Sequence, residues 1–177
     1  FPDKLNELAN GWCFEINNLK KINISESNDR FIFKNGKYLL GKSDTKNDNF
    51  DTLLFASRDI KEFSIPSNIK FISACAFENC KNLTKIKIPM NSDLQTIEPY
   101  TFKNTKIKEI YIPSKITKIC GCAFYECKDL IKVKIGAVSN LQIIESFAFY
   151  ATKINSFSVP PTVTEIGENA FIYCSKL

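Results

Sequence analysis

A fixed period in one column of phenylalanines constrains the fold of this chain more than any other feature. The steps between successive members are 22, 25, 22, 25 and 22 residues, so two steps make a 47-residue double unit. At this offset Ile65–Pro89 is closely similar to Ile112–Gly136. A period of about 20–50 residues predicts a solenoid, because each coil buries its apolar face only by stacking on its neighbours. The column consists of Phe55, Phe77, Phe102, Phe124, Phe149 and Phe171.

Each unit also carries a short alternating segment. Five or six residues after each Phe, the pattern apolar-x-x-apolar-x-apolar begins, as in Leu83, Ile86 and Ile88, and it often ends at a proline such as Pro89. Alternation of this kind predicts a short strand with one face turned inward. Proline has no N–H to donate and ends the ladder. We therefore expect one strand per coil, stacked into a parallel sheet about 4.8 Å apart.

A second apolar pair in each unit is expected on the opposite wall. From this pair through the Ala-Phe dipeptide we predict a helical turn, and we expect the Phe rings to stack from coil to coil. The fold class is thus a repeat solenoid, α/β to mainly β. The second pairs are Ile69/Ile72, Leu94/Ile97, Ile116/Ile119, Leu141/Ile144 and Val163/Ile166.

The first third of the chain departs from this period. Phe14 begins an earlier copy, but it precedes Phe55 by 41 residues, which indicates a hairpin and loop insertion at residues 28–54. Within it, Phe31–Leu40 surrounds an Asn35-Gly36 dipeptide that suits a type I′ turn, so we predict a β-hairpin there. Its apolar residues favour packing of one face on the solenoid. The hairpin is also a second candidate for partner binding, because insertions in solenoids often map to a binding face.

Three residues after each Phe lies a second column of small side chains. Members two coils apart are about 10 Å apart, whereas a disulfide needs Cα atoms within about 7 Å. We therefore favour buried free thiols that face backbone groups. A local bridge, Cys75–Cys80 or Cys122–Cys127, and a zinc site around Cys120, Cys122 and Cys127 are less favoured alternatives. The column consists of Cys80, Thr105, Cys127, Thr152 and Cys174.

Composition argues against several classes of function. The chain has no His, which excludes Ser-His and Cys-His nucleophile pairs and every His-containing metal site. It shows no phosphate-binding loop and no nucleophile elbow. No apolar run reaches the roughly 18 residues of a transmembrane helix. We expect a non-enzymatic protein with no cofactor, no metal and no membrane insertion in this segment.

The charge distribution indicates where a partner would bind. The net charge of +5 comes from lysine, with Arg30 and Arg58 as the two arginines, which is weak evidence for nucleic-acid binding. On the outward face of the predicted strands, one column alternates in sign, with Lys85, Glu109 and Lys132 in succession. The next column contains Lys87, Tyr111 and Lys134 and has no acid. This basic strip either binds a protein or an anionic glycan, or is simply a solvated face.

The candidate partner-binding residues are taken from these columns and from a third one that contains Lys108. Tyr is included because it is favoured in recognition surfaces. The set is Lys85, Lys87, Lys108, Tyr111, Lys132 and Lys134.

The recurring motif resembles a known family. A-F-x-x-C-x-x-L-x-x-I-x-I-P, followed by x-x-I-x-x-I-x-x-x-A-F, is similar to the BspA-like, or Treponema pallidum-type, leucine-rich repeats. The resemblance implies a right-handed leucine-rich-repeat solenoid without catalytic residues. It also implies a surface-exposed protein that adheres to host cells or to extracellular-matrix proteins such as fibronectin.

These observations predict one solenoid domain over residues 1–177. The chain ends at Leu177 in the middle of a coil, so we expect either a truncated coil or self-association through an uncapped end. The expected location is the cell surface. The alternative is an intracellular leucine-rich-repeat scaffold that binds a protein partner, which free thiols would favour.

Overall fold

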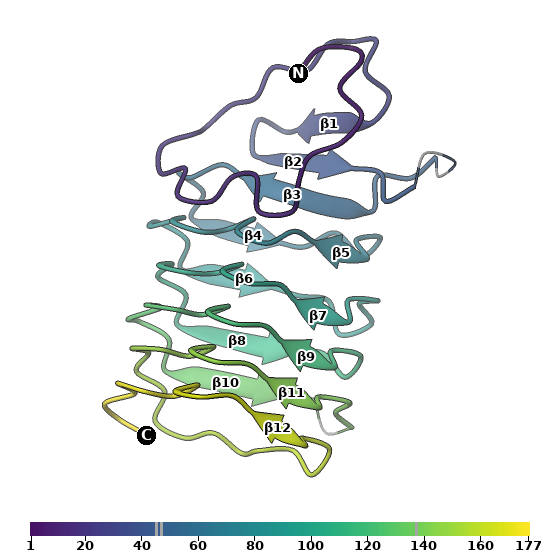
Figure 1. The fold of residues 1–177 in the computed structure, drawn as a ribbon. Coiled ribbons are helices and arrows are strands. Elements are labelled where there is room, and N and C mark those ends of the chain that lie inside the picture. The colour runs from purple at the N-terminus through teal and green to yellow at the C-terminus, as the bar shows by residue number, and fades with distance from the viewer. Residues whose placement is uncertain (45, 47, 137) are drawn as a thin grey trace.

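Short parallel strands stack coil upon coil in the computed structural model, which describes residues 1–44, 46, 48–136 and 138–177 (Figure 1). The predicted solenoid fold is confirmed. Strands β4 (Glu62–Ser64), β6 (Lys85–Lys87), β8 (Glu109–Ile112) and β10 (Lys132–Ile135) form the first wall. β4 pairs with β6 and β8 pairs with β10, both in parallel. These are the strands that the alternating segments predict.

The second wall consists of two-residue strands. They are β5 (Phe71–Ile72), β7 (Thr96–Ile97), β9 (Lys118–Ile119), β11 (Ile143–Ile144) and β12 (Glu165–Ile166). The last four form one parallel sheet in the order β7-β9-β11-β12. The second apolar pairs therefore do lie on the opposite wall.

The segment between the second wall and the next first-wall strand is not helical. None of the residues that the structure describes is in a helix, so the predicted helical turn is wrong. Alternate backbone N–H groups here donate to the next coil, as in Phe77 N–H to Thr101 O at 2.9 Å and Phe124 N–H to Ala148 O at 2.8 Å. The N–H groups between them donate within the turn, as in Glu78 N–H to Cys75 O at 3.0 Å. The turn enters and leaves with positive φ, for example 61° at Cys75. Bonds to the next coil thus interrupt the hydrogen bonding within the turn, and no helix forms.

Phenylalanine rings fill the interior. Phe77, Phe102, Phe124 and Phe149 are fully buried, and their successive ring centroids are 5.1–5.3 Å apart at interplanar angles of 3–19°. Phe171 continues the stack at 5.2 Å from Phe149.

Phe55, which the period places in the same column, lies outside this stack. It belongs to the extended strand β3 (Thr52–Ala56) and packs against Trp12, with ring centroids 5.8 Å apart. Ala56 takes the place of the Phe in this coil, because its N–H donates to Ala76 O at 2.8 Å as the N–H of Phe102 donates to Ala123 O at 2.9 Å. The Cys80 thiol lies 3.9 Å from Ala56 O and 3.7 Å from Ser57 O. The strand geometry of β3 therefore shifts the column by one residue.

The predicted hairpin is present. β1 (Phe31–Lys34) pairs antiparallel with β2 (Tyr38–Gly41), and Asn35 and Gly36 both have positive φ, 54° and 62°. β2 pairs antiparallel with β3, and β3 pairs in parallel with β5, so the hairpin extends the wall of the solenoid. Leu40 and Leu53 face the main core, whereas Leu39 and Leu54 face a second core.

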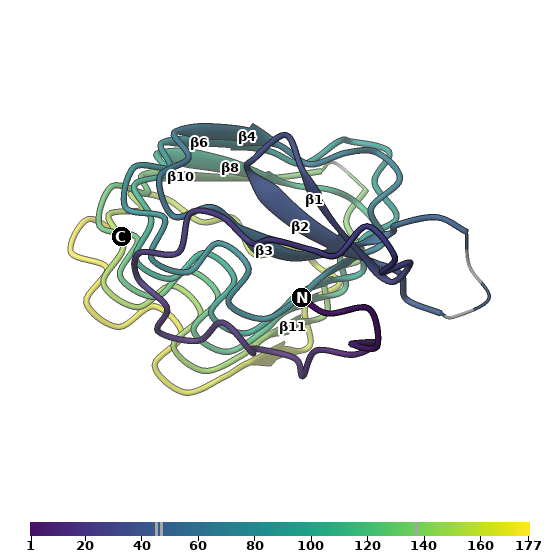
Figure 2. The ribbon, with the colours of Figure 1, turned by 90° about the horizontal axis from the view of Figure 1, so that it is seen from above.

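The N-terminal segment covers this second core. Seen along the stack, the coils superimpose and the segment runs across the end of the solenoid (Figure 2). Cys13 is fully buried while Phe14 is 46 % exposed, so Cys13 rather than Phe14 occupies the inward position of this earlier copy. Gly11 and Glu15 repeat the pair of positive φ angles four residues apart that marks the turns of later coils.

Candidate partner-binding sheet face

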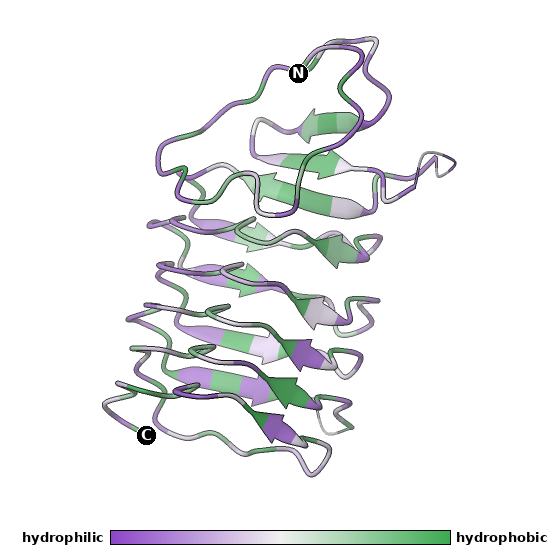
Figure 3. Cartoon of the chain, in the orientation of Figure 1, coloured by the Kyte–Doolittle hydropathy of each residue, from purple (hydrophilic) through white to green (hydrophobic). Residues whose placement is uncertain are grey.

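Four of the lysines predicted to bind a partner lie on the outer face of the first wall, namely Lys85, Lys87, Lys132 and Lys134. Along β6 the buried Ile86 stands between two exposed residues, Lys85 and Lys87, and in β10 Lys132 and Lys134 flank Val133. Figure 3 shows this alternation as hydrophilic and hydrophobic bands that follow one another along the first-wall strands. The pleat of a strand puts alternate side chains on opposite faces, so these lysines point to solvent.

The register places candidates from successive strands side by side. Lys132 is paired in register with Glu109, and Lys134 with Tyr111. Lys108 lies just before β8 and is exposed, and its carbonyl accepts a hydrogen bond from Ile131 N–H at 2.9 Å. The pairing of β8 with β10 therefore brings Glu109, Tyr111, Lys132 and Lys134 together, and the exposed Lys85 and Lys87 lie on β6 of the same wall.

Two of these lysines are ion-paired on the face itself. Lys85 Nζ lies 3.9 Å from a Glu62 carboxylate oxygen, as expected for a charge ladder, and Lys134 Nζ lies 2.7 Å from Glu109 Oε2. The second pair runs diagonally, so the column that has no acid in sequence is partly neutralised by its neighbour. The hydrogen bond and charge of Lys134, with further positive charge from Lys132 and Lys85, lower the pKa of Glu109.

Tyr111 lies over a gap in the next coil. It is half-buried, and a Cβ added to Gly136 would stand 3.0 Å from its hydroxyl oxygen. In other coils a proline such as Pro113 occupies the position of Gly136. The absence of a side chain at Gly136 thus leaves room for the phenol ring at the edge of the lysine face.

The Cys and Thr column faces backbone carbonyls. Cys127 Sγ donates to Phe102 O at 3.0 Å, and Cys174 Sγ donates to Phe149 O at 3.2 Å. Thr105 Oγ1 lies 3.4 Å from Cys127 Sγ, and the same contact recurs between Thr152 and Cys174 at 3.2 Å. All seven cysteines are free thiols, and burial raises the pKa of Cys127 to about 12. In the part of the chain that the structure describes, no group of three or more Cys, Asp or Glu is placed to hold a metal ion.

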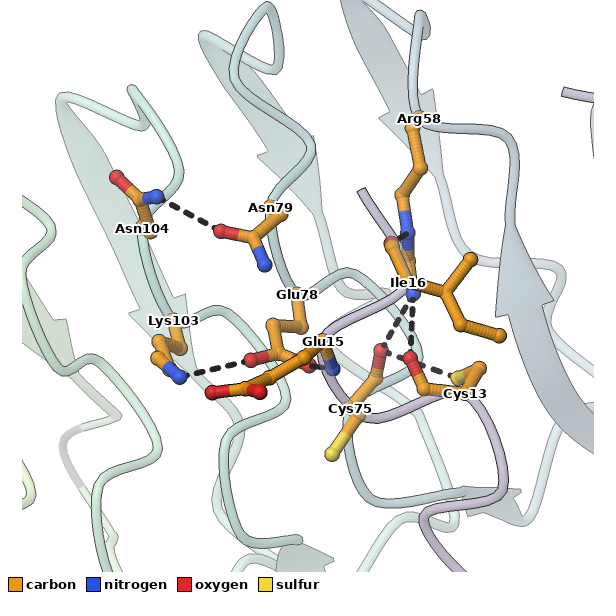
Figure 4. A network of polar contacts seen from close by, with 9 residues as sticks. All are labelled: Cys13, Glu15, Ile16, Arg58, Cys75, Glu78, Asn79, Lys103 and Asn104. Atoms are coloured by element: carbon orange, nitrogen blue, oxygen red, sulfur yellow. Dashed lines mark hydrogen bonds and ion pairs between the residues drawn. The ribbon is translucent and has the colours of Figure 1, made fainter. Parts of the chain in front are cut away.

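Sequence reasoning missed a buried polar network at the N-terminal end (Figure 4). The guanidinium of Arg58, a residue only 4 % exposed, lies 4.5 Å from the Phe55 ring centroid. It donates to the carbonyls of Ile16 at 2.9 Å and of Cys13 at 3.4 Å, both in the N-terminal segment. It also donates to Ala76 O at 3.0 Å in the next coil. The rarity of arginine in this lysine-rich chain was the one feature of the sequence that could have pointed to a special role for Arg58.

A buried ion pair continues the network toward the next coils. Glu78 is fully buried and pairs with Lys103 at 2.9 Å, while its other oxygen accepts the Glu15 N–H at 2.8 Å. Lys103 also lies 4.8 Å from the ring of Phe14. These contacts fix the N-terminal segment on the solenoid, and their role is structural.

Comparisons with known proteins identify related repeats and folds. The model of the BspA type leucine rich repeat region matches six copies over residues 48–177. The curated proteins give no significant match. Among solved structures, the pneumococcal vaccine antigen PcpA is similar with a TM-score of 0.67 and 19 % identity, over 82 % of this chain and 48 % of that one.

Two further structures share the fold. A leucine-rich-repeat protein from Eubacterium ventriosum gives a TM-score of 0.60 at 18 % identity, over 98 % of this chain and 57 % of that one. The T. pallidum leucine-rich-repeat protein gives 0.59 at 24 % identity, over 72 % of this chain and 62 % of that one. The chain thus spans between about half and three fifths of these structures. No helix in the described ranges is long and apolar enough to cross a membrane.

Proposed function

Because this chain belongs to the BspA-type leucine-rich-repeat family, a class of protein-interaction modules, we propose that it is part of a non-enzymatic cell-surface adhesin. In this proposal residues 1–177 act as one domain. The partner is a host-cell surface or extracellular-matrix protein, or an anionic glycan. It binds to the lysine face of the first wall, made up of Lys85, Lys87, Lys108, Tyr111, Lys132 and Lys134.

One observation carries this proposal. Lys87, Lys108 and Lys132 are exposed on the face and have no ion-pair partner among the described residues, whereas Lys85 and Lys134 are paired. A face with more lysines than carboxylates attracts anionic partners, and its association rate falls as salt is added. Half-buried Tyr111 adds an aromatic contact of the kind enriched at recognition surfaces.

An intracellular scaffold built from the same coils is the alternative, and the free thiols favour it. Protease accessibility of the full-length parent on intact cells separates the two locations. Cleavage of the repeats by added protease supports the adhesin, whereas protection until the cells are lysed supports the scaffold.

Binding to immobilised fibronectin, immobilised laminin and intact epithelial cells tests the proposal. We would compare the wild type with Lys87→Glu/Lys132→Glu at two salt concentrations. A matched control is Lys81→Glu/Lys153→Glu, which makes the same charge change at two exposed lysines outside the face. We expect saturable binding that weakens at high salt, is lost in the face variant and is retained in the control.

Two other outcomes contradict the proposal in different ways. Saturable binding that both variants retain supports an adhesin but excludes the lysine face as its binding site. The hairpin is then the second candidate for the site. Absence of binding to all three surfaces argues for the scaffold.

The C-terminal end of the stack offers a separate contact with a second copy. Ile166 is 47 % exposed and Tyr173 67 % exposed, although their counterparts Ile144 and Ala151 in the preceding coil are covered or half-covered. Sedimentation velocity over a range of concentrations measures self-association. Ile166→Lys should shift a dimer to monomer. A wild-type protein that stays monomeric at all concentrations would exclude this contact.

A further inference from the structure

A hollow of about 530 Å³ lies beneath the N-terminal segment, on the side of the molecule formed by β3, β5 and β7. Asn6–Asn10 of that segment contribute three asparagine and glutamate side chains to one side, and Arg30 and Lys42 flank the hairpin side. This volume is within the range of about 300–1,000 Å³ that is usual for small-molecule sites. The hollow is distinct from the lysine face of the first wall and is not used by the proposed function.

Two residues that line this hollow each carry a buried hydrogen-bond donor that has no acceptor among the described residues. The two donor atoms are Arg30 Nη1 and Thr52 Oγ1. The guanidinium plane of Arg30 is fixed, because its Nε donates to Asn6 O at 3.2 Å and its Nη2 donates to Lys42 O at 3.1 Å. Buried donors are normally satisfied, and unsatisfied ones often mark a missing partner. A carboxylate, which accepts several hydrogen bonds, fits this pair of donors.

The same hollow also carries negative charge. Glu98 lines it and is held in place by Thr96 Oγ1 at 2.7 Å and by Asn10 Nδ2 at 3.4 Å. Glu7 is exposed at the rim. Within the described ranges neither carboxylate has an ion-pair partner, so both are available to an ammonium group.

The floor supplies an apolar contact. Phe71 is 53 % exposed, which is unusual for a phenylalanine, and it stands in register with Thr52 on the neighbouring strand. Leu54 and Ile72 complete the apolar lining. A ligand that matches these features has a carboxylate, an ammonium group and an apolar side chain between them.

We propose that this hollow binds a short peptide with free termini. The peptide carboxylate accepts hydrogen bonds from Arg30 Nη1 and Thr52 Oγ1, its ammonium group faces Glu98, and an apolar side chain packs on Phe71. The charges of both signs at the hollow favour a zwitterion over a simple anion, which would meet Glu7 and Glu98 without compensation.

Calorimetric titration with the tripeptide Ala-Phe-Ala tests the proposal directly. Two matched probes are the same tripeptide with an amidated C-terminus and with an acetylated N-terminus. We expect saturable binding of the free tripeptide and a loss of about tenfold or more in affinity on amidation, since the buried donors then lose a charged acceptor. Acetylation should weaken binding less, because Glu98 already has two hydrogen-bond donors.

Variants separate binding from folding. Thr52→Val is nearly isosteric and removes an unpartnered hydroxyl, so it should raise the melting temperature slightly while weakening tripeptide binding. Arg30→Lys keeps the charge but loses the fork and should weaken binding by about tenfold. Lys34→Gln removes an exposed charge on the same hairpin, away from the hollow, and should leave binding unchanged.

Two results overturn the proposal. The first is the absence of saturable binding of the free tripeptide up to about 10 mM. A dissociation constant above this concentration corresponds to a binding free energy weaker than about −3 kcal/mol. The second is binding that persists unchanged in both Thr52→Val and Arg30→Lys, or that is indifferent to amidation. Neither result bears on the lysine face, so failure here is separable from failure of the adhesin proposal.

Discussion

The rings of Phe124 and Phe149 lie almost parallel, at 3°, with centroids 5.1 Å apart across two successive coils. Both rings are fully buried, and the backbone joins the same two coils through Phe124 N–H to Ala148 O at 2.8 Å. The aromatic column and the ladder of backbone bonds therefore hold the same junction. Loss of one ring leaves the coils hydrogen-bonded around a cavity.

Phe124→Ala should lower the free energy of unfolding by about 3–5 kcal/mol, because it removes a buried ring from a site that cannot collapse. Urea unfolding followed by circular dichroism measures the change. Phe14→Ala, at a ring that is 46 % exposed, is the comparison and should cost far less. A loss under about 1 kcal/mol for Phe124→Ala would show that the column does not stabilise the solenoid.

The buried thiol of Cys127 should make stability fall at alkaline pH. Burial raises its pKa from 9.0 to about 12. The unfolded chain then ionises this thiol at lower pH than the folded chain, so stability is complete below about pH 9 and declines as pH rises toward about 12. The decline from this one thiol approaches about 1 kcal/mol per pH unit.

Cys127→Thr provides the matched variant, because Thr105 and Thr152 occupy the same column in neighbouring coils. Urea unfolding of both proteins between pH 8 and pH 11 should show a shallower alkaline decline in the variant. Identical pH dependence in the two proteins would refute the raised pKa of Cys127.

Gly167 is required because another coil approaches it closely. A Cβ at this position would lie 2.5 Å from Ser146 N and 2.8 Å from Glu145 C, both backbone atoms. Gly167→Ala should therefore destabilise the protein by about 1–3 kcal/mol through overpacking. Gly121→Ala, whose Cβ would lie 3.4 Å from its nearest neighbour, should be tolerated better. Equal melting temperatures for the two variants would contradict this geometry.

Arg58 should hold the N-terminal segment in place. Its guanidinium reaches carbonyls of Cys13, Ile16 and Ala76, a pattern that the single ammonium of lysine cannot reproduce. In Arg58→Lys we expect faster amide hydrogen exchange at residues 10–16, with exchange near Phe149 unchanged. Uniform acceleration along the chain would indicate global destabilisation instead.

The repeat predicted the strands and the hairpin because both depend on local patterns. Ile86 alternates with lysines, and Asn35-Gly36 admits the positive φ of the turn. The turns resisted prediction because non-glycine residues such as Tyr100 and Phe147 have positive φ there, at 57° and 58°. Their own N–H groups bond to the next coil, as in Phe147 N–H to Glu168 O at 3.2 Å, a contact that no local pattern encodes. Phe55 and Phe14 were misplaced for a related reason, since β3 and the N-terminal segment follow tertiary contacts rather than the period.

The lysine face was predictable in position but not in pairing. Alternation identifies Lys87 and Lys134 as outward residues, whereas the diagonal ion pair of Lys134 with Glu109 depends on the twist between two strands. Arg58 and the hollow at Arg30 and Thr52 depend on contacts between segments more than 20 residues apart. Such contacts produce no periodic pattern in the sequence.

Lysine footprinting of the complex tests the central claim most directly. The protein is acetylated at low reagent concentration, free and bound to fibronectin or laminin, and each lysine is quantified by mass spectrometry. Contact through the lysine face predicts protection of Lys87, Lys108 and Lys132, with Lys81 and Lys153 modified equally in both states. Equal modification of all five lysines in the saturated complex, or protection confined to Lys81 and Lys153, would contradict the account.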